Sequence, residues 1–422
     1  MINKKLTILL TLITFCFVFA ETSVFSSISM GDIDPSFKYK TGIATIDSIS
    51  QSNHNFSTWA YQKNTTFSIS FSYSMNNVED NNGNTSAYDD LSIDEIVFTL
   101  PFGNKNVFGF SFYPTNIVDM TNTSESEATL DEGFENTYLK TLETRIGSIS
   151  NLSLIYGKKI NDLSFGTNVS AKFGNYDTNR RYLYRTYEAD NETIEWEKYF
   201  ENKEKTQFFH VTFGGSFLYT SKYGLNLGGN FSLPLSTYAQ KLTSSNSTTS
   251  YGTVIEEIDS EKYEINDVEW PFEFSTGLSY DFDKYSLSYD YFFKGYNGLN
   301  LGFDDSELSN YSRSVIGLSF KPSKKRIESY YKKIVYSVYF SHESRPYQFY
   351  SKTDDKYYDI SDISGTLSFK LPYNRDRSNV DLRFTYTRSA DTNDSLIDNI
   401  IKFQINFNSF DNWWLKKERY ND

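Results

Sequence analysis

Cysteine is almost absent from this chain of 422 residues, since only Cys16 occurs, inside an apolar stretch near the start. If that stretch is removed on export, the mature chain has no thiol, which excludes disulfides, thiolate metal sites and a cysteine nucleophile. Phe15 precedes Cys16, whereas lipoprotein processing favours a small residue there, so we expect no lipid anchor. Histidine is nearly as scarce, and the three present are too dispersed to indicate a metal site: His54, His210 and His342.

Positive charge is also in deficit, with 41 Lys and Arg against 54 Asp and Glu and a net charge of −13 at pH 7. Nucleic acids and anionic membrane surfaces both need clustered Lys and Arg, so the sequence argues against them as partners. No Gly-x-Ser-x-Gly motif marks a hydrolase. A Ser–His or Asp–His arrangement stays open, but nothing indicates one, so we expect no enzyme and no cofactor.

Aromatic residues are abundant instead, with 36 Phe and 34 Tyr beside only 8 Pro. Mean hydropathy is −0.52, so the chain is polar on average although it is rich in aromatic rings. This combination is typical of strands that have one face in lipid and the other in water.

The first residues resemble a secretory signal, with basic Lys4 and Lys5, an apolar stretch from Leu6 to Phe19, and a plausible cleavage site after Ala20. The alternative, a membrane anchor, is disfavoured because the stretch is shorter than the ~20 apolar residues of a spanning helix. We therefore expect a signal peptide over residues 1–20.

Alternation of apolar and polar residues with period two recurs along the chain beyond residue 64. In the segment from Phe67 to Met75, every odd position is large and apolar and every even position is serine. A helix would scatter these residues around its axis, so the pattern predicts strands. Fourteen are expected: 65–76, 92–103, 106–116, 142–157, 163–174, 206–220, 224–237, 270–282, 285–296, 311–322, 333–345, 362–373, 378–389 and 399–410.

The links between these strands alternate in length, seven long ones with six short ones. This rhythm is typical of an outer-membrane barrel whose termini and short turns lie in the periplasm. The fold class is therefore an all-β transmembrane antiparallel barrel of about 14 strands. A soluble β-sandwich or propeller is the rival architecture, and it rarely sustains this rhythm. The acidic long links are interpreted as solvated loops, because none has the ligand spacing of a calcium loop.

Three stretches resemble the FadL-type family of outer-membrane transporters: Ser27 to Gly31, Asn53 to Tyr61, and Leu100 to Gly103 leading into Phe108 to Pro114. The resemblance implies a barrel filled by an N-terminal hatch in its lumen, which takes up long-chain fatty acids or aromatic hydrocarbons. The family usually has Asn-Pro-Ala in the hatch, where this chain has Asn53-His54-Asn55. This chain also ends in a tail of residues 411–422, where outer-membrane barrels usually end in a terminal Phe.

The resulting organisation is a signal peptide at 1–20, a hatch at 21–64, the barrel at 65–410 and a periplasmic tail at 411–422. Within the lumen, cations on polar faces are candidates to pair with a fatty-acid carboxylate. Arg383 and Lys402 lie on adjacent expected strands and are the first choice. The alternative is a purely structural role, in which acidic neighbours such as Asp381, Glu95 and Glu273 form ion pairs with the cations and stabilise the barrel wall. The ligand-binding candidates are Arg383, Lys402, Arg313, Lys172, Trp59 and Tyr61.

The leading hypothesis for function is passive uptake of hydrophobic small molecules across a bacterial outer membrane. A general porin for polar solutes and a structural or secretion-associated barrel are the alternatives. The expected partners are outer-membrane lipids, hydrophobic cargo and, during biogenesis, the barrel-assembly machinery.

Overall fold

The computed structural model describes residues 40–47, 51–81, 83, 85–103, 105–128, 137–187, 194–249, 254–265, 268–300, 308–320, 329–351, 356–373 and 378–411. The expected signal peptide lies outside these residues, and so does the expected periplasmic tail apart from Asp411, which is the last residue of β15. No helix within the described ranges is long and apolar enough to span a membrane.

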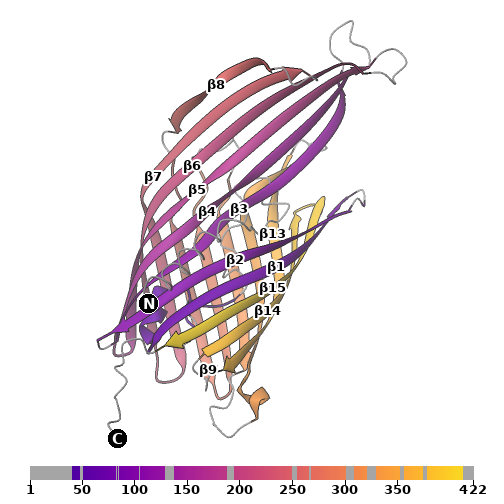
Figure 1. Ribbon diagram of the computed structural model, residues 1–422. Helices are drawn as coiled ribbons and strands as arrows, with labels where there is room; N and C mark the ends of the chain where they lie inside the picture. Colours follow the sequence, from indigo (N-terminus) through magenta and orange to yellow (C-terminus); the bar gives the residue numbers. More distant parts are fainter. Residues whose placement is uncertain are drawn as a thin grey trace, which may run out of the picture.

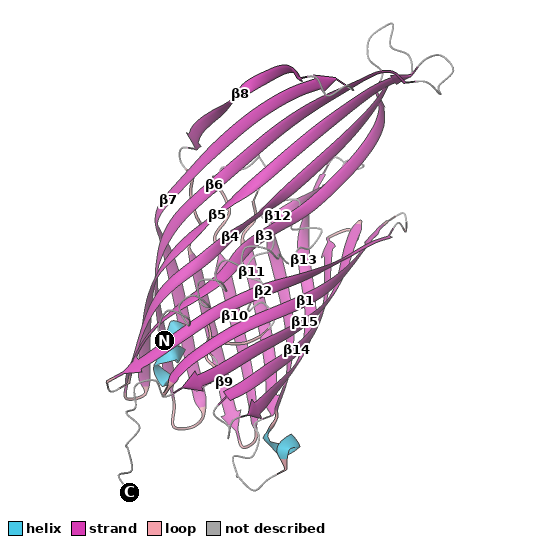
Figure 2. Cartoon of the chain, in the orientation of Figure 1, coloured by secondary structure: helices cyan, strands magenta, loops and turns pink. Residues whose placement is uncertain are grey.

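The described chain is built almost wholly from strands (Figures 1 and 2). Two short 3-10 helices are η2 (Phe56–Tyr61) and η3 (Tyr330–Lys333). The strands are β1 (Thr65–Asp80), β2 (Thr85–Phe102), β3 (Asn106–Ala128), β4 (Thr137–Ile160), β5 (Leu163–Tyr187), β6 (Ile194–Thr220), β7 (Leu225–Thr249), β8 (Val254–Ile265), β9 (Glu273–Phe282), β10 (Tyr285–Lys294), β11 (Tyr311–Phe320), β12 (Val335–Ser351), β13 (Lys356–Tyr373), β14 (Ser378–Asp391) and β15 (Leu396–Asp411).

Fourteen of these strands close into an antiparallel barrel. Each of them pairs with two neighbours, β1 with β15 and β2, and β7 with β6 and β9, so the ring has no end. In the described residues, β8 pairs with β7 alone and lies outside the ring. The predicted barrel and its number of strands are confirmed, whereas the expectation of a single loop over 238–269 is wrong, because β7 continues to Thr249 and β8 follows.

The predicted strands agree best with the structure at the end where the turns are short. Turn residues Lys105, Asn161 and Asp283 have positive φ, as tight turns require. At the opposite end the predictions are too short for β3 to β7, which have 23 to 27 residues. A strand of 25 residues, such as β5, is about 80 Å long at ~3.3 Å per residue, far beyond the ~9–11 residues that cross a bilayer.

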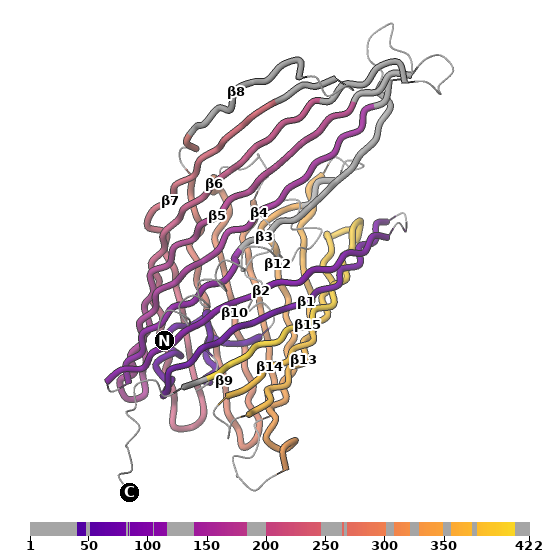
Figure 3. The backbone as a smooth tube through the Cα atoms, viewed as in Figure 1, coloured from indigo at the N-terminus to yellow at the C-terminus, as the bar shows by residue number. Residues whose placement is uncertain are grey.

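These long strands form an extension of the barrel, made of the described residues 116–128, 137–147, 175–187, 194–207, 238–249 and 254–265. Its part from β4 to β7 rises on one side in Figure 3. Its outer face has ion pairs, for instance Arg181 with Glu201 at 2.8 Å and Lys205 with Asp177 at 3.8 Å. Charged pairs interrupt the apolar face here, so the extension stands beyond the lipid-facing belt. The apolar alternation ends with the belt, which is why the sequence did not predict these strand ends.

Within the belt, the two faces of each strand differ as predicted. On β1, Ser70, Ser72 and Ser74 are buried inside the barrel while Tyr73 and Met75 are exposed outside. Serine hydroxyls bond across the inner wall, as Ser72 does with the Ser92 hydroxyl at 2.8 Å. The exterior therefore offers apolar surface to lipid, and the interior offers hydrogen-bonding groups.

Charge on the outer face should be costly only inside the belt. Leu154 on β4 is 53% exposed in mid-belt, and Leu242 on β7 is 37% exposed on the extension. We expect Leu154→Arg to lower the free energy of unfolding in lipid vesicles by about 2–4 kcal/mol. Leu242→Arg, the matched control, should lower it by no more than about 1 kcal/mol. Denaturant titration of vesicle-inserted protein measures both, and equal losses would contradict the assigned belt.

Candidate functional site

The described residues that precede β1 lie against the inner wall of the barrel. This inner segment comprises residues 40–47 and 51–64, and most of its side chains are buried. Its 3-10 helix η2 starts at Phe56 and is capped by Asn55, whose side-chain oxygen accepts from the Ser57 N–H at 3.0 Å. The same amide donates to the Phe217 carbonyl on β6 at 3.0 Å, which ties the turn to the wall.

The wall has glycine where the inner segment approaches it most closely. A Cβ at Gly166 on β5 would lie 2.4 Å from the Ser57 nitrogen, and one at Gly228 on β7 would lie 2.4 Å from the Ile43 carbonyl. At Gly277 on β9 the distance to the Ile43 Cβ would be 2.7 Å. Only glycine permits backbone to pack this closely, so the wall and the inner segment are matched in shape.

Polar contacts supplement this packing. The carboxylate of Asp290 on β10 accepts from the backbone N–H groups of Gly42 at 2.6 Å and Ile43 at 3.0 Å. Asn53 donates to Glu95 on β2 at 3.1 Å. The inner segment is thus fixed to opposite sides of the ring.

Lys40 joins the charged side of the lumen, where Arg383 and Asp381 lie. Burial and the nearby Arg383 guanidinium lower the pKa of Lys40 to about 7.

A small cavity of about 70 Å³ lies beside the inner segment. Its charged lining is a triad in which the Glu273 carboxylate is 2.8 Å from the Lys172 Nζ and 3.7 Å from the Lys294 Nζ. The other lining residues are Asn53, His54, Phe56, Tyr113, Asn151, Asn168, Ser170, Thr212, Asn230, Ser232, Phe274, Ser275, Phe292 and Phe293. Typical ligand pockets measure roughly 300–1,000 Å³, so a bound cargo requires the surrounding side chains to move apart.

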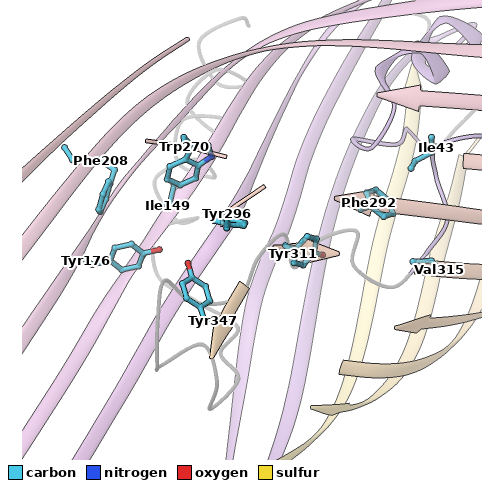
Figure 4. Close-up of a cluster of buried hydrophobic side chains, with 11 residues drawn as sticks. Ile43, Ile149, Tyr176, Phe208, Trp270, Phe292, Tyr296, Tyr311, Val315 and Tyr347 are labelled. Atoms are coloured by element: carbon cyan, nitrogen blue, oxygen red, sulfur yellow. The ribbon is translucent and has the colours of Figure 1, made fainter. Parts of the chain in front are cut away.

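Next to the cavity, buried apolar residues fill part of the lumen (Figure 4). This aromatic cluster consists of Ile43, Ile149, Tyr176, Phe208, Ala239, Trp270, Phe292, Tyr296, Tyr311, Val315 and Tyr347. Period-two alternation places polar residues on the inner wall of a barrel, so an apolar cluster there is an exception.

Phe292 belongs to both the cavity lining and the aromatic cluster. Its ring meets the His54 ring edge-on at 4.6 Å between centroids, and the Arg313 guanidinium lies 4.1 Å from it. Lys172 lies 5.3 Å from the Trp270 ring. Cations and aromatic rings thus alternate where the two regions meet.

The first-choice candidates, Arg383 and Lys402, lie on the adjacent strands β14 and β15 but not at the cavity. Arg383 contacts Asp381 at 2.7 Å and Gln404 at 2.7 Å, and Lys402 is 3.8 Å from Asp94. These contacts match the bracing alternative, in which acidic neighbours hold the cations.

The other four candidates are spread over the lumen. Lys172 lines the cavity and Arg313 stacks on Phe292. Trp59 is fully buried and donates to the Ser52 carbonyl at 2.8 Å, and the Tyr61 hydroxyl contacts that of Thr220 at 3.2 Å.

Sequence reasoning did not single out Lys294, Trp270 or Tyr296. Lys294 is the last residue of β10. Trp270 and Tyr296 were expected at the ends of strands 270–282 and 285–296, but β9 begins at Glu273 and β10 ends at Lys294, so both residues lie just outside the strands.

A family model described as BamG matches residues 1–421. No curated protein matches the sequence. Among solved structures, the toluene transporter TodX of Pseudomonas putida is similar, with a TM-score of 0.54 at 11% identity over 90% of this chain and 98% of that one. A FadL homologue of Pseudomonas aeruginosa has a TM-score of 0.54 at 11% identity, over 93% and 99% of the two chains. The resemblance to FadL-type barrels is confirmed, and at these identities it concerns the fold.

The fit between the inner segment and the wall can be tested at Gly166. We expect Gly166→Val to displace η2, because the new side chain meets backbone atoms that lie under 3 Å from the Cβ position. Small-ion conductance in a planar bilayer should rise. Gly365→Val is the matched control, since its closest neighbour is a Phe340 side-chain atom at 3.9 Å. Unchanged conductance in Gly166→Val would contradict a lumen-blocking role for the segment.

Proposed function

The chain belongs to the BamG family, and on that premise, together with its barrel fold, we propose that it lets hydrophobic small molecules cross a bacterial outer membrane. The observation that carries the proposal is the aromatic cluster inside the lumen. Water-filled pores have polar walls, whereas buried tyrosine, tryptophan and phenylalanine rings offer an apolar surface to cargo. Similar structures include the toluene transporter TodX and the monoaromatic hydrocarbon channel CymD, which is in keeping with such cargo.

The inner segment serves as the hatch in this proposal, and its position against the wall supports that role. Residues 21–64 are the proposed hatch domain, although 21–39 lie outside the described residues. Cargo passes when the hatch and the aromatic rings separate, because the cavity between them is too small in the closed state.

A second feature that suits apolar cargo is a short seam in the wall. β2 and β3 pair only from Ile96 with Phe112 to Phe102 with Asn106. Beyond this ladder β3 continues along β4, with an irregularity between Pro114 and Asn116. Figure 1 shows β3 rising away from β2. We propose that apolar cargo moves between lumen and lipid beside this seam, where few hydrogen bonds join the strands.

Long-chain fatty acids are the proposed cargo within this class. Lys172 and Lys294 would then hold the carboxylate, with the chain against Trp270 and Phe292. Arg383 and Lys402 are the weaker choice, since their ion pairs with Asp381 and Asp94 do not reach the cavity.

The alternatives fit the lumen less well. A general porin for polar solutes needs an open aqueous path, whereas the inner segment and the aromatic cluster occupy the interior. A structural or secretion-associated barrel would not need apolar side chains there. Catalysis is not proposed, and the barrel-assembly machinery remains the expected partner during insertion.

Fatty-acid binding can be followed through Trp270. A dibrominated long-chain fatty acid should quench its fluorescence, and Trp270→Phe should abolish that part of the signal. We expect Lys172→Gln to raise the apparent Kd for the fatty acid about ten-fold, as loss of a charged hydrogen bond implies. The Kd for a brominated alkane of equal length should stay unchanged.

Lys241→Gln is the matched control, because Lys241 also faces inward but pairs with Glu204 on the extension. No quenching by either ligand would refute hydrophobic cargo in the lumen. Equal weakening of both ligands would refute the assignment of the carboxylate to Lys172.

A further inference from the structure

One link at the short-turn end of the barrel is unlike the others. The other turns at this end have two to four residues, whereas residues 321–334 join β11 to β12. The described part of this link contains η3, which protrudes below the barrel in Figure 2. A hairpin needs no such length, so the added residues call for another explanation.

η3 lies toward the outside of the barrel. The Tyr336 hydroxyl donates to the Tyr331 carbonyl at 3.2 Å. Tyr336 is on the outer face of β12, since its neighbour Ser337 is buried within the lumen. Tyr330 and Tyr331 are 55% and 61% exposed, a high value for two adjacent aromatic side chains. η3 is therefore held beside the lipid-facing surface.

η3 lies next to a row of aromatic rings at the edge of the lipid-facing belt, which we call the aromatic belt. Eight rings follow one another across β9 to β15, with 4.9 to 6.4 Å between successive centroids. They belong to Tyr280, Phe282, Tyr285, Phe320, Tyr336, Phe369, Phe384 and Phe403. Such rings mark the boundary between lipid and water in barrels. Tyr336 links this aromatic belt directly to η3.

Lysine side chains occur just beyond the aromatic belt. Lys332 and Lys333 end η3, and Lys284 lies in the turn between β9 and β10, next to Asp283. Lysines at this level meet the phosphate groups of lipids, while their alkyl chains lie along the apolar surface.

We propose that η3 and the adjoining part of the aromatic belt form a binding site for an anionic phospholipid in the leaflet that faces the periplasm. The orientation rests on the proposed function. Tyr330 and Tyr331 enter the interface beside Tyr336, and Lys332 and Lys333 bind the anionic phosphate and the glycerol hydroxyls of the head group. The net charge of −13 does not oppose this, because screening confines such contacts to roughly 8–10 Å.

The mature protein in neutral detergent can be titrated with phosphatidylglycerol and analysed by native mass spectrometry. We expect the Kd of the tightest lipid to rise about five-fold in Lys332→Gln and about twenty-five-fold in Lys332→Gln/Lys333→Gln, in line with the strength of one lysine at a membrane surface. Phosphatidylcholine should bind all proteins equally. Lys222→Gln, in the exposed turn before β7, is the matched control and should keep the wild-type Kd.

Heat-modifiable migration confirms that each variant is folded, and quenching by brominated fatty acid should be unchanged in the double variant. The two proposals can therefore fail separately, because fatty-acid quenching reports on the lumen and phosphatidylglycerol binding reports on η3. An unchanged Kd for phosphatidylglycerol in the double variant overturns the proposal and assigns the protrusion to an acidic protein partner instead. An equally large rise in Kd in Lys222→Gln also overturns the proposal, because the lipid would then respond to the overall charge of this end of the barrel and not to η3.

Discussion

Every backbone N–H and C=O group inside lipid must find its partner within the protein, and the rest of this structure depends on that constraint. Strands meet it only by closing into a ring, which here happens where β7 pairs with both β6 and β9. Closure creates an inside and an outside, so side chains alternate between lumen and lipid. The lumen then needs filling, and the inner segment and the aromatic cluster occupy it.

The same constraint explains how far the sequence could predict the fold. Inside lipid the outward residues must be apolar, so β1 alternates strictly from Phe67 to Met75 and its position is clear from sequence. On the extension the outer face has charged pairs such as Arg181 with Glu201, so strict alternation with apolar residues is lost. There the hydrogen-bonded ladder continues without the hydrophobic signal, and the sequence-based strand ends were too early.

The candidate site was less predictable, because it depends on which strands face each other across the lumen. Alternation correctly placed Arg383 and Lys402 on adjacent strands, but Lys402 lies 3.8 Å from Asp94 on β2, with β1 between the two strands. Lys172 was identified as a lumen cation. Glu273 contacts both Lys172 and Lys294. These contacts arise because the closed ring brings β5 near β9 and β10, which the sequence pattern alone does not reveal.

The one-sided extension also has a mechanical consequence. It is continuous with β3 to β7, so a sideways load on it reaches the membrane through those strands. At its flanks the ring is held by seven residue pairs between β2 and β3 and by eight between β7 and β9, whereas β1 and β15 share sixteen. A pull on the extension is therefore concentrated on the β2–β3 ladder, which has the fewest residue pairs among the described neighbours of the ring.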